Sequence, residues 1–486
     1  MRSRMLCLDF SLVWCAGLRW CVCGSISNLG FPFLEISCEG GVSGLSILRV
    51  LSISVSFSVI VSGCSSFGGD DVLDVEHHVL DGDVPTRSLP ASVSEVGWEW
   101  SAEEAGGRLE YILPGVSGPL MVLGSGVVGL DGATGEELWS YRVPQTSSAR
   151  AGVAPDYESV LLTLSEGDVD TTVVLDSGTG RVLAEHEGDT GAIFQRTVEF
   201  TSNAAIVASK EPGSPVETFS LIEGERLWSF DPPERGAGVI VEKVLSVEDT
   251  VVLIMAYNDG GLRDDSVDTS EQGMLVIGLD KATGEPRWEL EQGFTDTVRR
   301  VADHELSPNG RALLLQVGSG NQRHEFLIDP VTGEEIEGEA YRVQERDPVG
   351  LLDDGYVETS IDHGESTVDY WYTSFTGEEV AHFEVSERPG EGDDVGRGLL
   401  LEEGVLRLDP LTEPDLERGP VEVEFARWEG SEAPLRLNAD LTVNEEIRAV
   451  PEGAVDSPYL PVATVVPGAV VVTEENPGPW TVVGLT

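Results

Sequence analysis

Apolar runs of strand length, separated by glycine-containing turns, recur along most of this chain. In Val127–Tyr141, VVGLDGATGEELWSY, one apolar run ends at Asp131 and a second run returns after Gly135. Gly135 suits a turn position with positive φ, and the side chains of Asp131 and Thr134 can hydrogen-bond the turn backbone. The stretch therefore predicts a β-hairpin.

The same turn returns at a nearly constant spacing. With the turn glycine as the marker, successive intervals are 45, 44, 60, 49 and 44 residues, and the polar segment Asn258–Gly273 accounts for the longest. A period of this length made of strand-turn-strand units is typical of a β-propeller, in which each blade is a four-stranded sheet. The marker glycines are Gly135, Gly180, Gly224, Gly284, Gly333 and Gly377.

These residues also carry a family resemblance. An apolar strand, Asp-x-x-Thr-Gly and a tryptophan four residues later resemble the PQQ-like repeat of quinoprotein alcohol dehydrogenases and of many non-enzymatic lipoproteins. The resemblance implies that this tryptophan docks between adjacent blades. The complete copies are Asp131/Thr134/Gly135/Trp139 and Asp280/Thr283/Gly284/Trp288. The partial copies are Asp176/Thr179/Gly180 with Ala184 at the tryptophan position, Gly224/Trp228, Asp329/Thr332/Gly333 with Glu337 at that position, and Thr376/Gly377.

The repeats predict an all-β fold, a single β-propeller over residues 95–486. These 392 residues divide by the period into about eight four-stranded blades, and seven is the alternative because Asp409–Pro467 does not divide clearly into strands. An open ring would expose unpaired strand edges. We therefore expect Trp480–Thr486 to pair with Glu95–Ser101.

The N-terminal part predicts export and a lipid anchor. A short apolar run, Leu51–Val61, leads into Val61-Ser62-Gly63-Cys64, which resembles the lipobox of bacterial lipoproteins. The run is too short for a membrane span but suits a signal peptide over residues 45–63, with Cys64 as the lipidated residue. Ordinary secretion and a retained anchor are the alternatives. Residues 1–44 do not resemble a signal peptide and are interpreted as a mis-annotated extension.

Residues 64–94 are rich in Asp, Ser, Gly and Pro. This composition lacks the apolar side chains that would offset the entropy of ordering a chain. It predicts a disordered acidic tether between the lipid anchor and the propeller.

The charge of the chain excludes one class of partner. The formal net charge is −56, which repels nucleic acid, so no nucleic-acid partner is expected. The charge is interpreted as a solvated acidic surface, with recruitment of a basic partner or of cations as the alternative.

The sequence lacks residues that quinoprotein catalysis would need. The quinoprotein resemblance implies a quinone held above a tryptophan, a disulfide between neighbouring cysteines, a calcium or lanthanide ion and a catalytic aspartate. No cysteine follows Cys64, and the seven histidines show no metal-binding spacing. We therefore predict no catalytic, cofactor-binding or metal-binding residues and no cofactor.

The sequence thus predicts an exported, lipid-anchored propeller on the outer face of the cytoplasmic membrane. Its expected role is non-catalytic protein binding or scaffolding at the cell envelope, with a protein partner that the sequence does not identify. The alternatives are a sensor that binds a small molecule or a cation, and a PQQ-dependent dehydrogenase.

Overall fold

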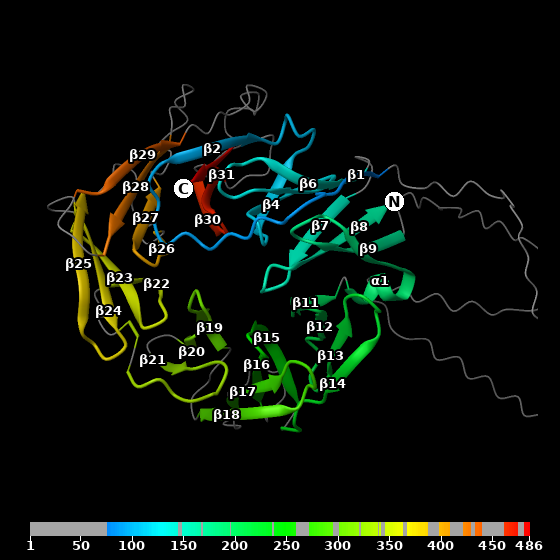
Figure 1. Cartoon of the computed structure of the whole chain (residues 1–486). Helices are drawn as coiled ribbons and strands as arrows, with labels where there is room; N and C mark the ends of the chain where they lie inside the picture. The colour runs from blue at the N-terminus through cyan, green and yellow to red at the C-terminus, as the bar shows by residue number, and fades with distance from the viewer. Residues whose placement is uncertain are drawn as a thin grey trace, which may run out of the picture. The chain divides into compact units, whose positions relative to one another are not determined.

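Eight β-sheets form a closed ring in a computed structural model of the protein (Figure 1). We call the sheets blades 1 to 8, and within a blade we letter the strands A to D from the centre of the ring to its rim. The structure describes residues 75–486 except 144–147, 167–168, 195, 236–237, 259–271, 295–300, 320–321, 339, 342–345, 363–366, 387–397, 409–420, 429–432, 440–460 and 475–480. The predicted extension, signal peptide and lipidation site at Cys64 lie outside the described residues.

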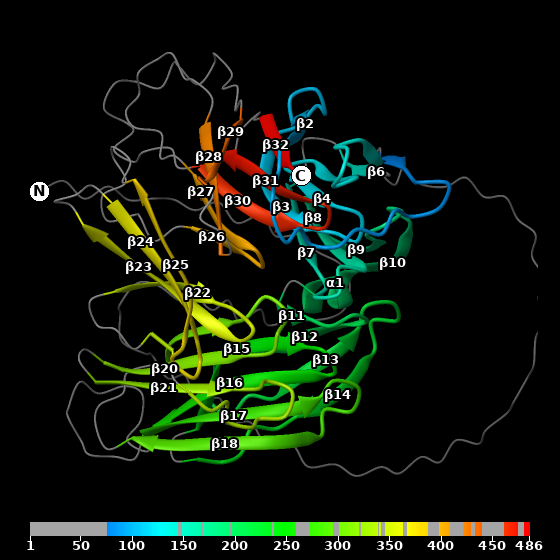
Figure 2. The same ribbon diagram turned by 60° about the vertical axis from the view of Figure 1, so that its left-hand side comes forward.

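The first four blades follow the chain in order from strand A to strand D. Blade 1 contains β3 (Leu109–Pro114), β4 (Pro119–Leu123), β5 (Gly126–Leu130) and β6 (Glu137–Arg142), and blade 2 contains β7 (Ser148–Val153), β8 (Ser159–Glu166), β9 (Val169–Asp176) and β10 (Val182–Glu187). Blade 3 contains β11 (Thr197–Phe200), β12 (Ala204–Ala208), β13 (Val216–Ser220) and β14 (Arg226–Phe230), and blade 4 contains β15 (Val239–Val247), β16 (Thr250–Asn258), β17 (Gln272–Asp280) and β18 (Pro286–Phe294). The four strands of blade 4 lie side by side in Figure 2.

The remaining blades complete the ring. Blade 5 contains β19 (Val301–Leu306), β20 (Leu313–Ser319) and β21 (Gln322–Ile328), and blade 6 contains β22 (Asp347–Leu351), β23 (Gly355–Asp362), β24 (Thr367–Ser374) and β25 (Glu379–Ser386). Blade 7 contains β26 (Leu399–Leu401), β27 (Gly404–Leu408), β28 (Val421–Arg427) and β29 (Leu435–Ala439), and blade 8 contains β30 (Pro461–Val466), β31 (Ala469–Glu474), β32 (Thr481–Leu485) and β2 (Val96–Ser101).

Two blades depart from the four-stranded plan. Blade 5 has three strands among the described residues, and the bridge between Ile328 and Glu335 stands where its strand D would begin. Blade 1 gains a fifth strand, β1 (Glu76–His78), outside β6. The helix α1 (Gly188–Phe194) connects blades 2 and 3 and is the single helix that the structure describes.

Both ends of the chain share blade 8. Strand β2 pairs with β32 in antiparallel register, from Val96 opposite Leu485 to Ser101 opposite Thr481. This confirms the predicted closure and gives eight blades rather than the alternative of seven. Because strand D of the last blade comes from the N-terminal side, β32 is paired on both of its edges and the two ends of the chain are held in one sheet.

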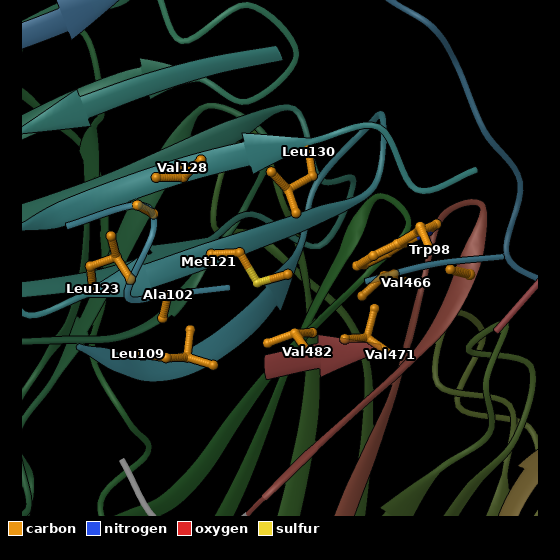
Figure 3. Packing of buried hydrophobic residues seen from close by; sticks show 12 residues of the cluster. Trp98, Ala102, Leu109, Met121, Leu123, Val128, Leu130, Val466, Val471 and Val482 are labelled. Atoms are coloured by element: carbon orange, nitrogen blue, oxygen red, sulfur yellow. The ribbon is translucent and has the colours of Figure 1, made fainter. Parts of the chain in front are cut away.

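The core lies between the blades. The buried apolar side chains form eight clusters, and each is drawn mainly from two neighbouring blades. Figure 3 shows the cluster between blades 8 and 1, in which Trp98, Met121 and Val471 meet. Every residue of β4 and β5 is buried, because a neighbouring blade covers each face. Burial on both faces explains why these strands are continuous apolar runs.

The segment before the propeller differs from the sequence-based expectation. Residues 75–94, predicted as part of a disordered tether, lie along the ring, and the side chain of Val93 is buried in the cluster between blades 7 and 8. We call residues 75–94 the strap.

Candidate functional site

The turn between strands C and D is the recurring polar feature of the ring. Its glycine has a φ of 72° at Gly135 and 71° at Gly180, in the left-handed region that glycine enters at little cost. The Asp131 carboxylate accepts a hydrogen bond from the backbone N–H of Ala133 at 2.8 Å. The Thr134 hydroxyl accepts one from the backbone of the residue after Gly135. The side chains of the repeat thus satisfy turn backbone that would otherwise be unpaired.

The other copies repeat this geometry. Asp176, Asp280 and Asp329 accept from their own turn backbone, as do the hydroxyls of Thr179, Thr283 and Thr332. Ser220 takes the place of the aspartate in the Gly224 turn and Ser374 in the Gly377 turn, where the hydroxyls of Ser374 and Thr376 also lie 3.0 Å apart. In these two turns a serine hydroxyl therefore accepts the backbone hydrogen bond that an aspartate accepts in the other copies. A search for Asp-x-x-Thr-Gly does not find this substitution.

Each repeat tryptophan joins two blades. Its indole N–H donates to a carbonyl of the C–D turn in the next blade, and its ring lies against the turn glycine of that blade. The donor-acceptor pairs are Trp98 to Gly132 (2.7 Å), Trp139 to Ser177 (2.7 Å), Trp228 to Lys281 (3.0 Å) and Trp288 to Val331 (3.0 Å). Trp98 was not assigned to the repeat from the sequence, because strand D of blade 8 precedes blade 1 in the chain.

Blade 2 has Ala184 at the tryptophan position and joins blade 3 differently. The Nε2 atom of His186, two residues further along β10, lies 2.7 Å from the carbonyl oxygen of Leu221. Leu221 follows Ser220, so this carbonyl matches the one that the indole reaches in the first three pairs. The ring of Phe194, in α1, lies 4.8 Å from the His186 ring and is also buried. His186 and α1 together occupy the place of the missing indole.

Arginine side chains cover two of the repeat aspartates. Arg287 contacts Asp280 Oδ2 at 2.6 Å and Asp249 Oδ1 at 2.6 Å. These hydrogen bonds favour the ionised carboxylates and lower the pKa of both Asp249 and Asp280. In blade 1 the strap supplies the cation, since Arg87 Nη2 lies 2.8 Å from Asp131 Oδ2.

The strap begins at the rim between blades 1 and 2. Its first residues form β1, in which His77 lies opposite Tyr141 of β6. His77 Nε2 lies 2.7 Å from the carbonyl oxygen of Gly180, and the Leu80 N–H donates to the carbonyl of Thr179 at 3.0 Å. The strap is therefore attached both to a strand edge and to the neighbouring C–D turn.

From there the strap crosses turns of blades 1, 8 and 7. Arg87 reaches blade 1, and the strap then accepts hydrogen bonds from the A–B turns of blades 8 and 7 before it enters β2. These later bonds run from Gly468 N to Ser88 O (2.8 Å) and from Glu403 N to Ala91 O (2.9 Å). The strap thus ties blades 2, 1, 8 and 7 together across the seam of the ring.

Blade 6 carries a row of polar and aromatic side chains towards blade 5. Glu358, Trp371 and His382 lie opposite one another on β23, β24 and β25. The guanidinium of Arg346 lies 3.7 Å from the centre of a Trp371 ring and 3.5 Å from Glu358 Oε2. A cation over an indole beside a buried carboxylate is a stabilising arrangement. Arg346 therefore contacts both Trp371 and Glu358.

Among the described residues, no group of three or more His, Cys, Asp or Glu side chains could hold a metal ion. In the part of the chain that the structure describes, no helix is long and apolar enough to cross a bilayer. Because no cysteine follows Cys64, the neighbouring-cysteine disulfide implied by the quinoprotein resemblance has no residues to form it.

The chain is similar to one protein family and to several solved structures. A family model described as outer membrane protein assembly factor BamB matches residues 98–321. No curated protein matches the chain. Among solved structures, BamB from Moraxella catarrhalis is 16% identical, with a TM-score of 0.37, over 82% of this chain and 100% of that one. The quinohemoprotein alcohol dehydrogenase ADHIIG from Pseudomonas putida HK5 is 11% identical, with a TM-score of 0.38, over 82% of this chain and 78% of that one.

Proposed function

We propose that this PQQ-like β-propeller repeat protein is an exported, lipid-anchored scaffold that binds another protein at the cell envelope without catalysis. The ring would present the loops of its two faces to a protein partner. Lipidation of Cys64 would hold it at the outer face of the cytoplasmic membrane.

The observation that carries the proposal is that the polar groups of the repeat already have hydrogen-bond or ion-pair partners within the ring. Asp131 accepts from turn backbone through Oδ1 and pairs with Arg87 through Oδ2. The Trp139 N–H is used in docking blade 1 on blade 2. The residues that carry the quinoprotein resemblance therefore have structural partners, which favours a structural ring whose faces bind partners over a cofactor site.

The family match supports the protein-binding part. Its description names an outer membrane protein assembly factor, and this supports a role in bringing proteins together at the envelope. The lipobox-like sequence that ends at Cys64 supports the anchoring part.

Site-specific photocrosslinking in the native envelope would test protein binding. Glu136 lies in a C–D turn and Glu187 at the opposite end of a strand D, so a photoreactive residue at each samples a different face. We expect one position to give an adduct of defined mass and the other to give none. Adduct-free protein at both positions would contradict the proposal.

Two further measurements separate the alternatives. Labelled palmitate should enter the wild-type protein but not Cys64→Ala. Equilibrium dialysis with PQQ and calcium should show no stoichiometric retention. Retention of both would instead favour the dehydrogenase, and retention of calcium alone would favour a cation sensor.

A further inference from the structure

We propose that the outer edge of β14, at the rim of blade 3, binds an extended, basic segment of a partner protein, which adds to the sheet as a fifth strand. This inference rests on the proposed protein-binding function and names a surface and a partner chemistry for it. It follows from the way in which the chain itself completes blade 1.

Blade 1 shows how a rim strand binds an extended segment. Strand β1 pairs with β6 in antiparallel register and places His77 opposite Tyr141. All three residues of β1 are exposed, so the backbone pairing contributes most of its contacts. The one printed side-chain hydrogen bond joins His77 Nε2 to the carbonyl oxygen of Gly180 in the next blade, at 2.7 Å. An extended segment is thus bound through a strand edge and the neighbouring C–D turn, which is the chemistry of strand addition.

Strand β14 repeats the sequence of β6. Leu138–Tyr141 reads LWSY and Leu227–Phe230 reads LWSF, and Leu-Trp-Ser occurs nowhere else in the chain. In both strands the indole lies against the turn glycine of the next blade, where a Cβ at Gly180 or at Gly284 would come within 2.6 Å of the ring. The φ values of these two glycines are 71° and 73°. The rims of blades 1 and 3 therefore combine the same strand with the same neighbouring turn.

The repeated residues are covered in blade 1 and exposed in blade 3. Ser140, opposite His78 of β1, is 7% exposed, whereas Ser229 is classed with the exposed residues. Leu138 is half-buried, whereas Leu227 is 50% exposed. In the part of the chain that the structure describes, no strand pairs with the outer edge of β14. Blade 3 thus presents the edge that β1 covers in blade 1.

The residue after the aromatic one determines which charge the partner should carry. Blade 1 has Arg142 there, opposite Glu76 of β1, whereas blade 3 has the exposed Asp231. Opposite charges stabilise a cross-strand pair and like charges destabilise it. The β1 segment of a second copy would bring Glu76 against Asp231, which disfavours it as the occupant. A partner with lysine or arginine at this position suits both Asp231 and the net charge of −56.

The contact made by His77 defines the next position of the partner segment. In the register of β1, the residue after the basic one lies opposite Phe230, as His77 lies opposite Tyr141. A histidine there is placed to donate to the carbonyl of Gly284, because His77 reaches the carbonyl of the equivalent Gly180. The segment that fits blade 3 is therefore extended and carries a basic residue followed by histidine.

A labelled peptide tests this site on the full-length protein. The probe is the octapeptide of residues 74–81 with Glu76→Lys, and the unchanged octapeptide is the comparison. In fluorescence anisotropy at low ionic strength, we expect the lysine peptide to bind several-fold more tightly than the unchanged one. Its binding should also slow hydrogen exchange in β14 but not in β18.

A charge reversal in the protein provides the matched control. Asp231→Lys should reverse the preference between the two peptides. Glu334→Lys makes the same change in net charge at an exposed position on blade 5 and should leave the preference unchanged. No binding of the lysine peptide, binding without slower exchange in β14, or a preference that survives Asp231→Lys would overturn this inference and leave protein binding by other surfaces of the ring in place. Absence of a partner adduct in the native envelope would instead contradict the proposed function, and this inference with it.

Discussion

The indole N–H of Trp139, in blade 1, donates a 2.7 Å hydrogen bond to the carbonyl oxygen of Ser177, in the C–D turn of blade 2. The Trp139 side chain is fully buried. The contact therefore links a residue of the repeat to the assembly of the ring, because it joins blade 1 to the C–D turn of blade 2.

Replacement of Trp139 should separate the hydrogen bond from the packing. Trp139→Phe leaves the Ser177 carbonyl without its donor and should lower the free energy of unfolding by about 1–3 kcal/mol. Trp139→Ala should cost about 3–5 kcal/mol because it also opens a cavity. Urea unfolding measures both. The half-buried Trp100 supplies the control, and a loss for Trp100→Phe as large as that for Trp139→Phe would contradict the docking role.

The turn glycine that receives this indole offers a second test. Gly180 and Gly213 have nearly equal φ values of 71° and 73°, but a Cβ at Gly180 would lie 2.6 Å from Trp139 atoms whereas one at Gly213 would meet nothing within 4 Å. Gly213→Ala should cost about 1–2 kcal/mol from backbone strain alone. Gly180→Ala should cost clearly more in the same urea titration. Equal losses in the free energy of unfolding would mean that the Trp139 side chain can move away from the new Cβ at no cost in stability.

The strap should contribute to the stability of the seam. Val93 is 1% exposed, so Val93→Ala removes two buried carbon groups and should cost about 1.6 kcal/mol. Hydrogen exchange should also accelerate in β2 and β32. Val198, 49% exposed, is the matched control, and Val198→Ala should change stability by less than about 0.5 kcal/mol. Unchanged exchange in Val93→Ala would argue against a role of the strap in closure.

The fold could be predicted from the sequence because the hairpin turn repeats. Asp131, Thr134 and Gly135 act through bonds within a few residues of one another, so the motif already contains its own physical cause. Ring closure followed because an unpaired edge is unfavourable. These features depend on local chemistry or on topology alone.

The strap and the His186 contact could not be predicted in the same way. The strap is polar, and its order comes from turn groups, such as the Thr179 carbonyl, that come together only in the folded ring. His186 lies two residues after the expected tryptophan position. The β-bulge before Ala184 also occurs before Trp139, Trp228 and Trp288, so it does not distinguish blade 2. The Leu221 carbonyl and the Phe194 ring that contact His186 come together with it only in the folded ring.

The arginine bridge in blade 4 predicts a specific pH dependence. Hydrogen bonds from Arg287 lower the pKa of Asp249 and Asp280 below the ordinary value of 3.8. Carboxylates with a lowered folded-state pKa stabilise the fold above that ordinary value, and this contribution is lost as the pH falls through the folded-state pKa. The difference in urea midpoint between wild type and Arg287→Leu should therefore be present at pH 7 and shrink below about pH 4.

Leucine is a fitting replacement for Arg287 because Leu138 and Leu227 hold the same position, before the tryptophan, in blades 1 and 3. The exposed pair of Arg226 and Glu217 supplies the control, since Arg226→Leu removes an ion pair that does not involve a repeat aspartate. A difference for Arg287→Leu that stays constant from pH 7 to pH 3 would show that the side chain acts through packing and not through its charge.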